Sequence, residues 1–469
     1  MRINHKSDLL FLGLFLMSLV LRLALAIVNR QANDDHMEVV NRIIVTGALP
    51  QKDDCWECFQ PKLFHSTIAL TLEGFGLANA PDDTKILVAQ LVNFIAGLIS
   101  LGVIAIFIRD LPVSVERIKP LGFALIALNP QLVRISSQAT NDGFAILFST
   151  LALYLAYKLF LKPNTRTFLF VILFSVLGIA SKSNAWVTAS AISLALFTWV
   201  WIIKETRTKV LVYAISFLLV VPLLSVVNPL TQYITNTQKY GSPILLNIPK
   251  PALPHWSEVT YPRRPGIISI KDGYFTFKFF SLLRNPLDRD IGTNIPSHRT
   301  SLWTQLYASA NSLRFEDFPP SWGTAGQEGF TVLRGIFILA LLPTIIFFFG
   351  AAIELFRVLK NFVKRIPIIG RETAFGLFDF AFLGYILFEA LYALVYRDYP
   401  VMKAIFLYPG LLAFALIFIR GGDRIYKFFS RRGNWAIYSI EIGICGLLIL
   451  YIMDIVPMIQ QLYSFGLGS

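Results

Sequence analysis

Acidic residues gather in one short stretch near the start of this sequence, directly after its first apolar run. Asp34 and Asp35 follow residues 9–28, which are predominantly apolar, by only a few positions. If that run spans a membrane, the two carboxylates are held near the membrane surface, where one of them can abstract a proton from a hydroxyl group. The pair could instead cap the short helix that follows, since acidic side chains favour the positive end of a helix. The spacing leaves both interpretations open.

A second polar group stands between two later apolar runs, in the stretch NPQLVRISSQATNDGF at residues 129–144. Arg134, Asn141 and Asp142 fall at the boundary of an apolar segment, and Asp142 begins the next expected helix. Asp142 could bind a metal or orient a substrate, with Arg134 near a phosphate. It could equally serve as the N-terminal cap of that helix.

Three cations mark other expected helix ends: Lys62 in QPKLFH, Lys182 in SKSNAW and Arg397 in YRDYPVMK. Positive charge at such a place offsets the negative charge that develops on a phosphate leaving group. The alternative is that each side chain only anchors its helix by extending toward the membrane interface.

Cys55 and Cys58 form a CxxC pattern in the same acidic stretch. Three states fit this spacing: a local disulfide, two free thiols, or half of a zinc site completed by His36 or His65. Cys445 lies in the last apolar run and is interpreted as an apolar filler.

Membrane-spanning helices are the elements that must position these residues. The chain of 469 residues is 55% hydrophobic, has a mean hydropathy of +0.60 and is only 15% charged, whereas soluble domains average about 25% charged residues. A spanning helix needs ~20 mostly apolar residues. We expect spans near residues 9–28, 86–108, 119–135, 143–161, 167–181, 185–203, 210–228, 331–356, 374–395, 401–419 and 435–453. The expected fold is therefore an all-α polytopic membrane protein with about 11 transmembrane helices; the first run could also be a cleaved signal peptide, but it is long enough to span.

Basic residues fall in alternate short connections between these runs, and the formal net charge is +13. By the positive-inside rule those connections are cytoplasmic, which puts the N-terminus inside and the C-terminus outside. This topology accounts for the positive charge without a nucleic-acid partner. The bases are Arg2 and Lys6; Arg109, Arg117 and Lys119; Lys158, Lys162 and Arg166; Lys204, Arg207 and Lys209; Arg357, Lys360, Lys364, Arg365 and Arg371; and Arg420, Arg424, Lys427, Arg431 and Arg432.

Two long segments remain for the outer side. Residues 1–230 form an expected transmembrane module that carries the first outer loop, 29–85; residues 229–330 form the second outer loop; and residues 331–469 form the C-terminal helices. Helical spacing predicts a short amphipathic helix that ends at Gly47 and Pro50, and an interfacial segment over 61–78. In the second loop, DGYFTFKFFSLLRNP at 272–286 predicts a juxtamembrane helix.

Aromatic and polar residues alternate later in the second outer loop, in SLWTQLYASANSLRFEDFPPSW at 301–322. Trp303, Tyr307 and Glu316 are of the kinds that stack on sugars and hydrogen-bond to them. An ordinary aromatic belt at the membrane interface would use the same residues.

In their order along the chain, these motifs resemble the glycosyltransferase C superfamily of membrane enzymes that use polyprenyl-phosphate sugars, and in particular its protein mannosyltransferase and aminoarabinose transferase group. The resemblance covers roughly residues 9–230 and 396–409. It rests on the acidic pair, a G-x-L-P at Gly47 to Pro50, QPKLFH, NPQLVRISSQATNDGF, SKSN and YRDYPVMKAIFLYP.

The resemblance implies an inverting sugar transfer on the non-cytoplasmic face, without a covalent sugar–enzyme intermediate. Asp34 or Asp35 would be the general base, and Asp142 a second catalytic acid at the acceptor or metal site. Lys62 departs from the proline that relatives often have at its position. The implied donor-phosphate contacts are Lys62, Arg134, Lys182 and Arg397, and the implied acceptor or sugar contacts are His36, His65, Trp303, Tyr307 and Glu316.

The implied partners are a polyprenyl-phosphate sugar donor, membrane lipid, and an acceptor that is a protein, a lipid or a glycan. A divalent metal, Mg²⁺ or Mn²⁺, is a conditional cofactor: relatives with monophosphate donors often need none, whereas those with diphosphate donors usually bind one.

A transporter or lipid-linked-sugar flippase is the main alternative, because ionisable residues fall within the expected spans. Against it, the two halves of the chain show no duplication and no matched pair of broken helices. An assembly or polymerase subunit is a third interpretation. The ionisable residues are Arg22, Asp379, Glu389 and Glu441.

Overall fold

A computed structural model describes residues 5–31, 35–202, 207–245, 269–287, 297–315, 327–364, 371–396, 402–431, 433 and 435–467. These residues form helices and connecting turns, and none of them lies in a β-strand. Three of the predicted site residues, Asp34, Glu316 and Arg397, fall outside the described residues, as does the proline-rich stretch 246–268.

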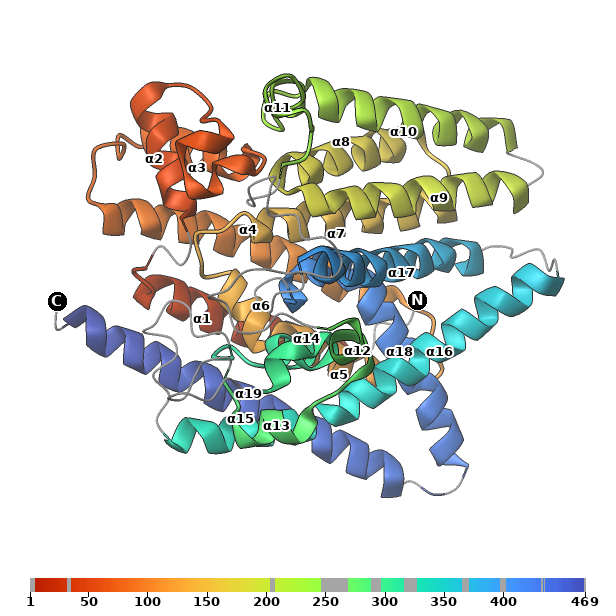
Figure 1. Cartoon of the computed structure of the whole chain (residues 1–469). Coiled ribbons are helices and arrows are strands. Elements are labelled where there is room, and N and C mark those ends of the chain that lie inside the picture. The colour runs from red at the N-terminus through yellow and green to blue at the C-terminus, as the bar shows by residue number, and fades with distance from the viewer. Residues whose placement is uncertain are drawn as a thin grey trace.

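The helices follow the predicted runs closely (Figure 1). The long helices are α1 (His5–Val28), α4 (Asp82–Asp110), α7 (Asp142–Leu161), α8 (Thr165–Ser181), α9 (Trp186–Ile202), α10 (Arg207–Val227), α15 (Gln327–Leu339), α16 (Leu341–Lys364), α17 (Arg371–Tyr396), α18 (Leu411–Ser430) and α19 (Trp435–Leu467). The shorter ones are α2 (His36–Thr46), α3 (Leu63–Gly74), α5 (Ile118–Ala127), α6 (Pro130–Ile135), α11 (Tyr233–Tyr240), α12 (Ile270–Phe275), α13 (Phe279–Arg284) and α14 (Leu302–Asn311). Single turns of 3-10 helix are η1 (Lys52–Asp54), η2 (Trp56–Phe59), η3 (Ser183–Ala185), η5 (Ser297–Thr300) and η8 (Ala404–Gly410).

Eight helical segments within the described residues are long and apolar enough to cross a membrane, and further apolar helices are shorter. Each of the predicted spans overlaps one helix or two consecutive ones, which confirms the all-α polytopic fold. Only a helix or a closed barrel satisfies its backbone hydrogen bonds in lipid, so length and apolarity suffice for this prediction.

The predicted span 119–135 is broken into α5 and α6, and the sequence explains the break. Pro130 occupies the first turn of α6, where the missing N–H costs nothing. Asn129 caps the same helix, because its side chain accepts a hydrogen bond from the backbone N–H of Leu132 at 3.0 Å. The chain therefore changes direction at Asn129 within the depth of the bundle.

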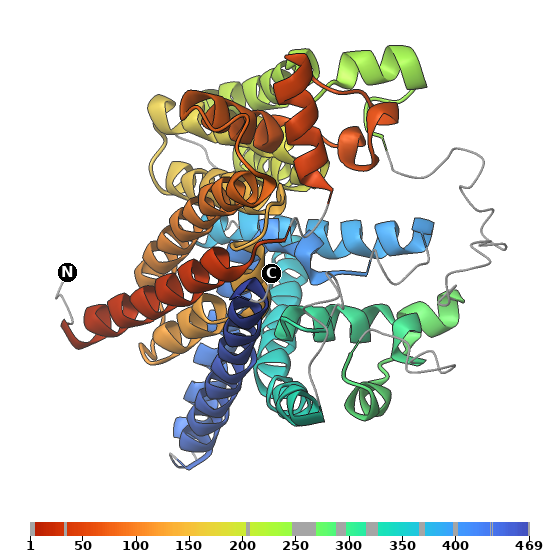
Figure 2. The ribbon, with the colours of Figure 1, turned by 90° about the vertical axis from the view of Figure 1, so that its left-hand side faces the viewer.

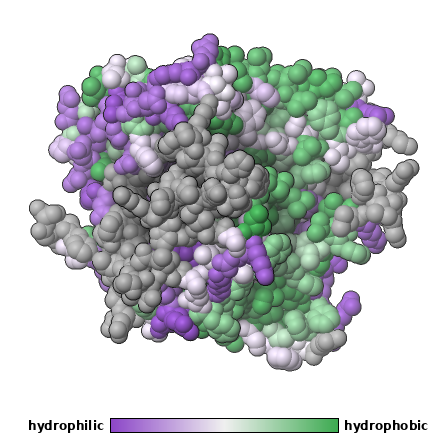
Figure 3. All heavy atoms as spheres, in the orientation of Figure 1, coloured by the Kyte–Doolittle hydropathy of each residue, from purple (hydrophilic) through white to green (hydrophobic). Residues whose placement is uncertain are grey.

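Two spans form the interior of the bundle. In α7 67% of the apolar window is buried, and in the segment 404–430 the value is 72%, whereas it is 33% in α1 and α10. Helix α7 packs against α4, α8 and α17, and α18 packs against α16. The outer helices leave apolar side chains such as Leu218, Leu219 and Leu223 exposed, and Figure 3 shows a broad hydrophobic surface with hydrophilic residues gathered over α2 and α3. Lipid is the solvent that such a surface requires.

Residues 29–85, the first predicted outer loop and called the first outer segment below, contain the predicted amphipathic helix as α2. Gly47 ends it in the left-handed region, at φ 64°, and its N–H bonds to the carbonyl of Ile43. Helix α3, at 12 residues, is too short to span and lies against α2 and α4; its place at the membrane interface stays a prediction. Met37, Phe64 and Phe144 belong to the apolar cluster that joins these helices to α7.

The single juxtamembrane helix predicted over 272–286 is in fact two, α12 and α13. The backbone between them forms hydrogen bonds to residues at the start of α14. The Ser301 hydroxyl donates to the Thr276 carbonyl at 2.5 Å, and the Lys278 N–H donates to the Thr304 hydroxyl at 2.8 Å. These tertiary hydrogen bonds replace the helical ones. In Figure 2, α12–α14 lie toward the same side of the molecule as α2 and α3, away from the N-terminal end of α1.

Candidate active site

Asp142 and Lys182, 40 positions apart in sequence, form an ion pair at one end of the bundle. Asp142 begins α7, and Lys182 follows the last residue of its neighbour α8. Lys182 Nζ donates to Asp142 Oδ1 at 2.6 Å, and the two side chains are only 15% and 8% exposed. The sequence predicted separate roles for these residues, but the fold makes them one unit.

Two histidines connect this pair to the first outer segment. The Thr140 hydroxyl donates to Asp142 Oδ2 at 3.0 Å and lies 3.4 Å from His36 Nε2. His36 Nδ1 and His65 Nε2 are 2.9 Å apart. Burial and the neighbouring charge on His36 lower the pKa of His65 well below its ordinary value, so His65 is neutral. A hydrogen-bonded path therefore runs from α3 through α2 to Asp142.

Asp35 immediately precedes His36 and so stands at the edge of this path. Its side chain is exposed and makes no capping hydrogen bond to α2, although capping was one interpretation of the acidic pair. Its neighbour Asp34 lies outside the described residues. Asp35 is thus an exposed residue directly beside the buried network.

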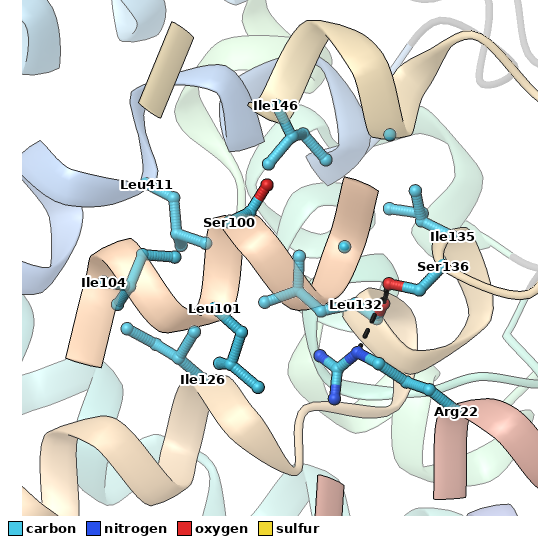
Figure 4. Close-up of a pocket in the computed structure, with 12 residues that line it drawn as sticks. Arg22, Ser100, Leu101, Ile104, Ile126, Leu132, Ile135, Ser136, Ile146 and Leu411 are labelled. Atoms are coloured by element: carbon cyan, nitrogen blue, oxygen red, sulfur yellow. Dashed lines mark hydrogen bonds between the residues drawn. The ribbon is translucent and has the colours of Figure 1, made fainter. Parts of the chain in front are cut away.

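Polar side chains from α1, from the residue that follows it and from α4 hold the loop that leads to Asp142. Arg22 Nε donates to the Ser136 hydroxyl at 3.3 Å (Figure 4), and Asn29 Nδ2 donates to the Ser137 carbonyl at 3.0 Å. Asn93 Nδ2 donates to the carbonyls of both Ile135 and Gln138, each at 2.8 Å. Arg22 is one of the ionisable residues that would also suit a transporter. The motifs do not point to Asn29 or Asn93; the available signal was the amide of Asn93 inside the apolar run of α4.

Close packing between α4 and α7 also holds the start of α7 in place. A side chain at Gly143 would place its Cβ 1.8 Å from Asn93 Oδ1, so only glycine allows α4 and α7 to approach here. The cavity in Figure 4, beside Arg22 and Ser136, has a volume of about 20 Å³. It can hold about one water molecule and is far too small for a sugar.

Gln60 of the QPKLFH motif is hydrogen-bonded to Asn141, the residue that precedes Asp142. Asn141 Nδ2 donates to Gln60 Oε1 at 2.5 Å and to the Ser181 carbonyl at 3.1 Å. Gln60 in turn donates to the buried carboxylate of Glu57. Gln60 and Asn141, which are 81 positions apart, thereby join the two motifs.

Lys62 of the same motif is fully buried, and its side chain forms hydrogen bonds within its own loop. Its Nζ donates to the carbonyls of Cys58 at 2.5 Å and Gln60 at 2.6 Å. Burial lowers the pKa of Lys62 to about 7, although the charges of Glu57 and Asp54 oppose the shift. A neutral amine still supplies two N–H donors, which is what the two carbonyls need.

The lowered pKa of Lys62 predicts a pH-dependent stability. Between pH 7 and about 10 the unfolded chain binds the lysine proton and the folded protein does not, so the free energy of unfolding rises with pH, by at most about 1.4 kcal/mol per pH unit. Thermal unfolding of the detergent-solubilised protein at pH 7, 8 and 9 measures this slope. The variant Lys62→Met should lose the Lys62 part of the slope, and an unchanged slope would show that Lys62 stays protonated when buried.

Cys55 and Cys58 form a disulfide, so their sulfurs are not available as zinc ligands. Within the described residues, no cluster of three or more histidine, cysteine, aspartate or glutamate side chains could hold a metal ion. At Asp142 a divalent metal would have to displace Lys182 from the carboxylate. The described residues around Asp142 therefore fit a metal poorly.

The late motif, YRDYPVMKAIFLYP, contacts Lys182 through Phe406 of η8. Lys182 Nζ lies 5.3 Å from the centre of the Phe406 ring, and Asn184 Nδ2 is 3.5 Å from the Phe406 carbonyl. A cation over an aromatic face is attracted by the ring quadrupole. Arg397, the predicted cation of this motif, lies outside the described residues.

The remaining predicted contacts lie apart from Asp142. Arg134 is buried, with Nη1 3.4 Å from the Leu313 carbonyl. On α14, Trp303 Nε1 donates to the Tyr274 carbonyl at 2.8 Å, and the Tyr307 hydroxyl donates to the Phe337 carbonyl. The polar atom of Trp303 thus bonds within the second predicted outer loop, whereas that of Tyr307 bonds to α15. Their predicted roles in sugar binding stay predictions, as does that of Glu316.

Part of the chain matches a known protein family. Residues 82–226 match the family described as dolichyl-phosphate-mannose-protein mannosyltransferase. The matched region runs from α4 to the end of α10 and contains Asn93, Asp142 and Lys182. No curated protein sequence matches the chain.

Solved structures with a similar arrangement of helices include ArnT from Cupriavidus metallidurans bound to undecaprenyl phosphate. It is 13% identical, with 99% of this chain and 79% of that chain covered and a TM-score of 0.44. The Archaeoglobus fulgidus oligosaccharyltransferase in its apo form is 12% identical, with 97% of this chain and 55% of that chain covered and a TM-score of 0.41.

The fold and the family match define the class of this protein: it is a multi-pass membrane glycosyltransferase. The match over residues 82–226 also confirms the resemblance to the mannosyltransferase group of the glycosyltransferase C superfamily that the motifs indicated.

Proposed function

We propose that the protein transfers a sugar from a polyprenyl-phosphate-linked donor to an acceptor on the non-cytoplasmic face of the membrane, with inversion at the anomeric carbon. The observation that carries this proposal is the Asp142–Lys182 pair beside the first outer segment, within the region that matches the mannosyltransferase family. The description of that family, which uses dolichyl-phosphate-mannose, supports a polyprenyl-phosphate sugar as the donor.

Lys182 would stabilise the leaving group. When the bond between the anomeric carbon and the phosphate oxygen breaks, polyprenyl phosphate gains negative charge, and a preformed cation beside it lowers the barrier. Before the donor binds, Asp142 holds the Lys182 ammonium in place at 2.6 Å. The donor phosphate would then share Lys182 with Asp142, so the lysine needs no reorganisation during the reaction.

An aspartate of the acidic pair would act as the base. The acceptor hydroxyl attacks the anomeric carbon from the face opposite the phosphate, and its proton passes to Asp34 or Asp35. One displacement inverts the configuration and leaves no covalent intermediate. The exposed carboxylate of Asp35, next to the His36 path, supports a base on this segment. His36 and His65, with the second outer segment, would orient the acceptor.

The test is sugar transfer by the purified protein in detergent with an acceptor extract from its own membranes. A panel of radiolabelled polyprenyl-phosphate sugars should pass label to the acceptor fraction, and the matching nucleotide sugars should not. Analysis of the product's anomeric configuration then tests inversion.

Transfer from a nucleotide sugar, or retention of configuration, would contradict the proposal. Absence of binding to every lipid-linked sugar, together with proton-coupled uptake in proteoliposomes, would support the transporter.

A further inference from the structure

A polar cavity lies at the opposite end of α18 from the candidate active site. Helix α18 follows η8, whose Phe406 contacts Lys182, and Asp423 lies 12 residues after Leu411, or roughly 18 Å along the helix. The cavity has a volume of about 180 Å³, several times the ~30 Å³ of a water molecule. The residues that line it are Leu111, Pro112, Val113, Ser114, Phe375, Leu416, Arg420, Asp423, Arg424 and Lys427.

Asp423, the single acidic residue of the lining, already has hydrogen-bond and ion-pair partners. Asp423 Oδ1 accepts hydrogen bonds from the backbone N–H groups of Ser114 at 2.8 Å and Val115 at 2.9 Å. Its Oδ2 pairs with Lys427 at 2.8 Å. Asp423 therefore fixes the loop between α4 and α5 as one wall of the cavity and has little capacity left for a cation.

Not every basic side chain of the lining is paired with a carboxylate. Arg420 pairs with Glu354 at 2.8 Å and lies 5.0 Å from the centre of the Phe375 ring. Arg424 is exposed at the mouth, and no carboxylate within the described part of the chain pairs with it. The cavity therefore combines a fixed guanidinium inside with a second, uncompensated one at its opening.

We propose that this cavity binds a phosphate-bearing anion, namely the phosphodiester headgroup of an anionic membrane lipid. Arg424, supported by Lys427, would contact the phosphate, since guanidinium groups match phosphate oxygens in geometry as well as charge. Leu111, Leu416 and Phe375 give the cavity an apolar wall, which suits the start of an acyl chain. Basic pockets between transmembrane helices at the membrane boundary bind anionic headgroups in this way.

The test measures lipid retention by native mass spectrometry on purified protein titrated with phosphatidylglycerol or phosphatidylcholine. The wild-type protein should retain phosphatidylglycerol and not phosphatidylcholine, and Arg424→Gln should weaken this binding by about fivefold. Arg431→Gln is the matched control, because Arg431 is exposed just beyond the same helix and does not line the cavity. It should bind as the wild type does.

Inorganic phosphate distinguishes the two sources of the ligand chemistry. If millimolar phosphate leaves phosphatidylglycerol bound, the lipid headgroup is the ligand. If phosphate binds instead and loses affinity in Arg424→Gln, the cavity is an anion site for soluble phosphate and the lipid part of the proposal is wrong. Equal lipid retention in wild type and Arg424→Gln, or an equal loss in Arg431→Gln, would overturn the site altogether.

Discussion

One of the two variants Asp34→Asn and Asp35→Asn should lower kcat by about 10²–10⁴-fold and still bind the donor, because general base catalysis contributes about that factor. An asparagine keeps the size of the side chain but cannot accept the proton of the acceptor hydroxyl. The measurement is single-turnover transfer from the active polyprenyl-phosphate sugar, with donor binding measured separately on the same preparations.

Asp53→Asn is the control for this experiment. Asp53 is an exposed acid of the same outer segment, and it pairs with Lys239 at 3.6 Å and accepts a hydrogen bond from the Tyr240 hydroxyl. It should transfer sugar at the wild-type rate. Unaltered turnover in both Asp34→Asn and Asp35→Asn would exclude the acidic pair as the base, although the transferase itself could stand.

Lys182→Met should lower kcat/KM for the donor by about 10²–10³-fold, the usual loss when a group that stabilises transition-state charge is removed. The same change leaves the buried carboxylate of Asp142 without its cation, which should reduce the free energy of unfolding by about 3–5 kcal/mol. Activity and stability therefore fall together in this variant.

A second substitution separates the two losses. In the double variant Lys182→Met with Asp142→Asn, the buried charge is gone, so stability should return toward the wild-type value while transfer stays low. Lys158→Met supplies a matched control, since Lys158 pairs with Asp110 at 3.3 Å at the other end of α7. If the double variant recovers transfer as well as stability, Lys182 has only a structural role.

The sequence determined which parts of this chain are helices and where polar chemistry could occur. A spanning helix must be long and apolar because lipid offers its backbone no hydrogen-bond partners, so the runs from residue 9 to residue 453 could be read directly. Gly47 predicted the end of α2 for a similarly local reason, since glycine reaches the left-handed conformation without steric cost. The order of short motifs sufficed to indicate the glycosyltransferase class that the family match confirmed.

Only the tertiary structure decided which of these polar residues meet. Asp142 and Lys182 pair because α7 and α8 are antiparallel neighbours, and hydropathy carries no information about which helix ends lie together. The motif suggested a phosphate contact for Lys62, and only the tertiary structure showed that the side chain is buried, although the two carbonyls it bonds to lie in its own loop. Asn93 holds the Asp142 loop from within an apolar helix. Such partners depend on long-range packing, and local spacing therefore could not predict them.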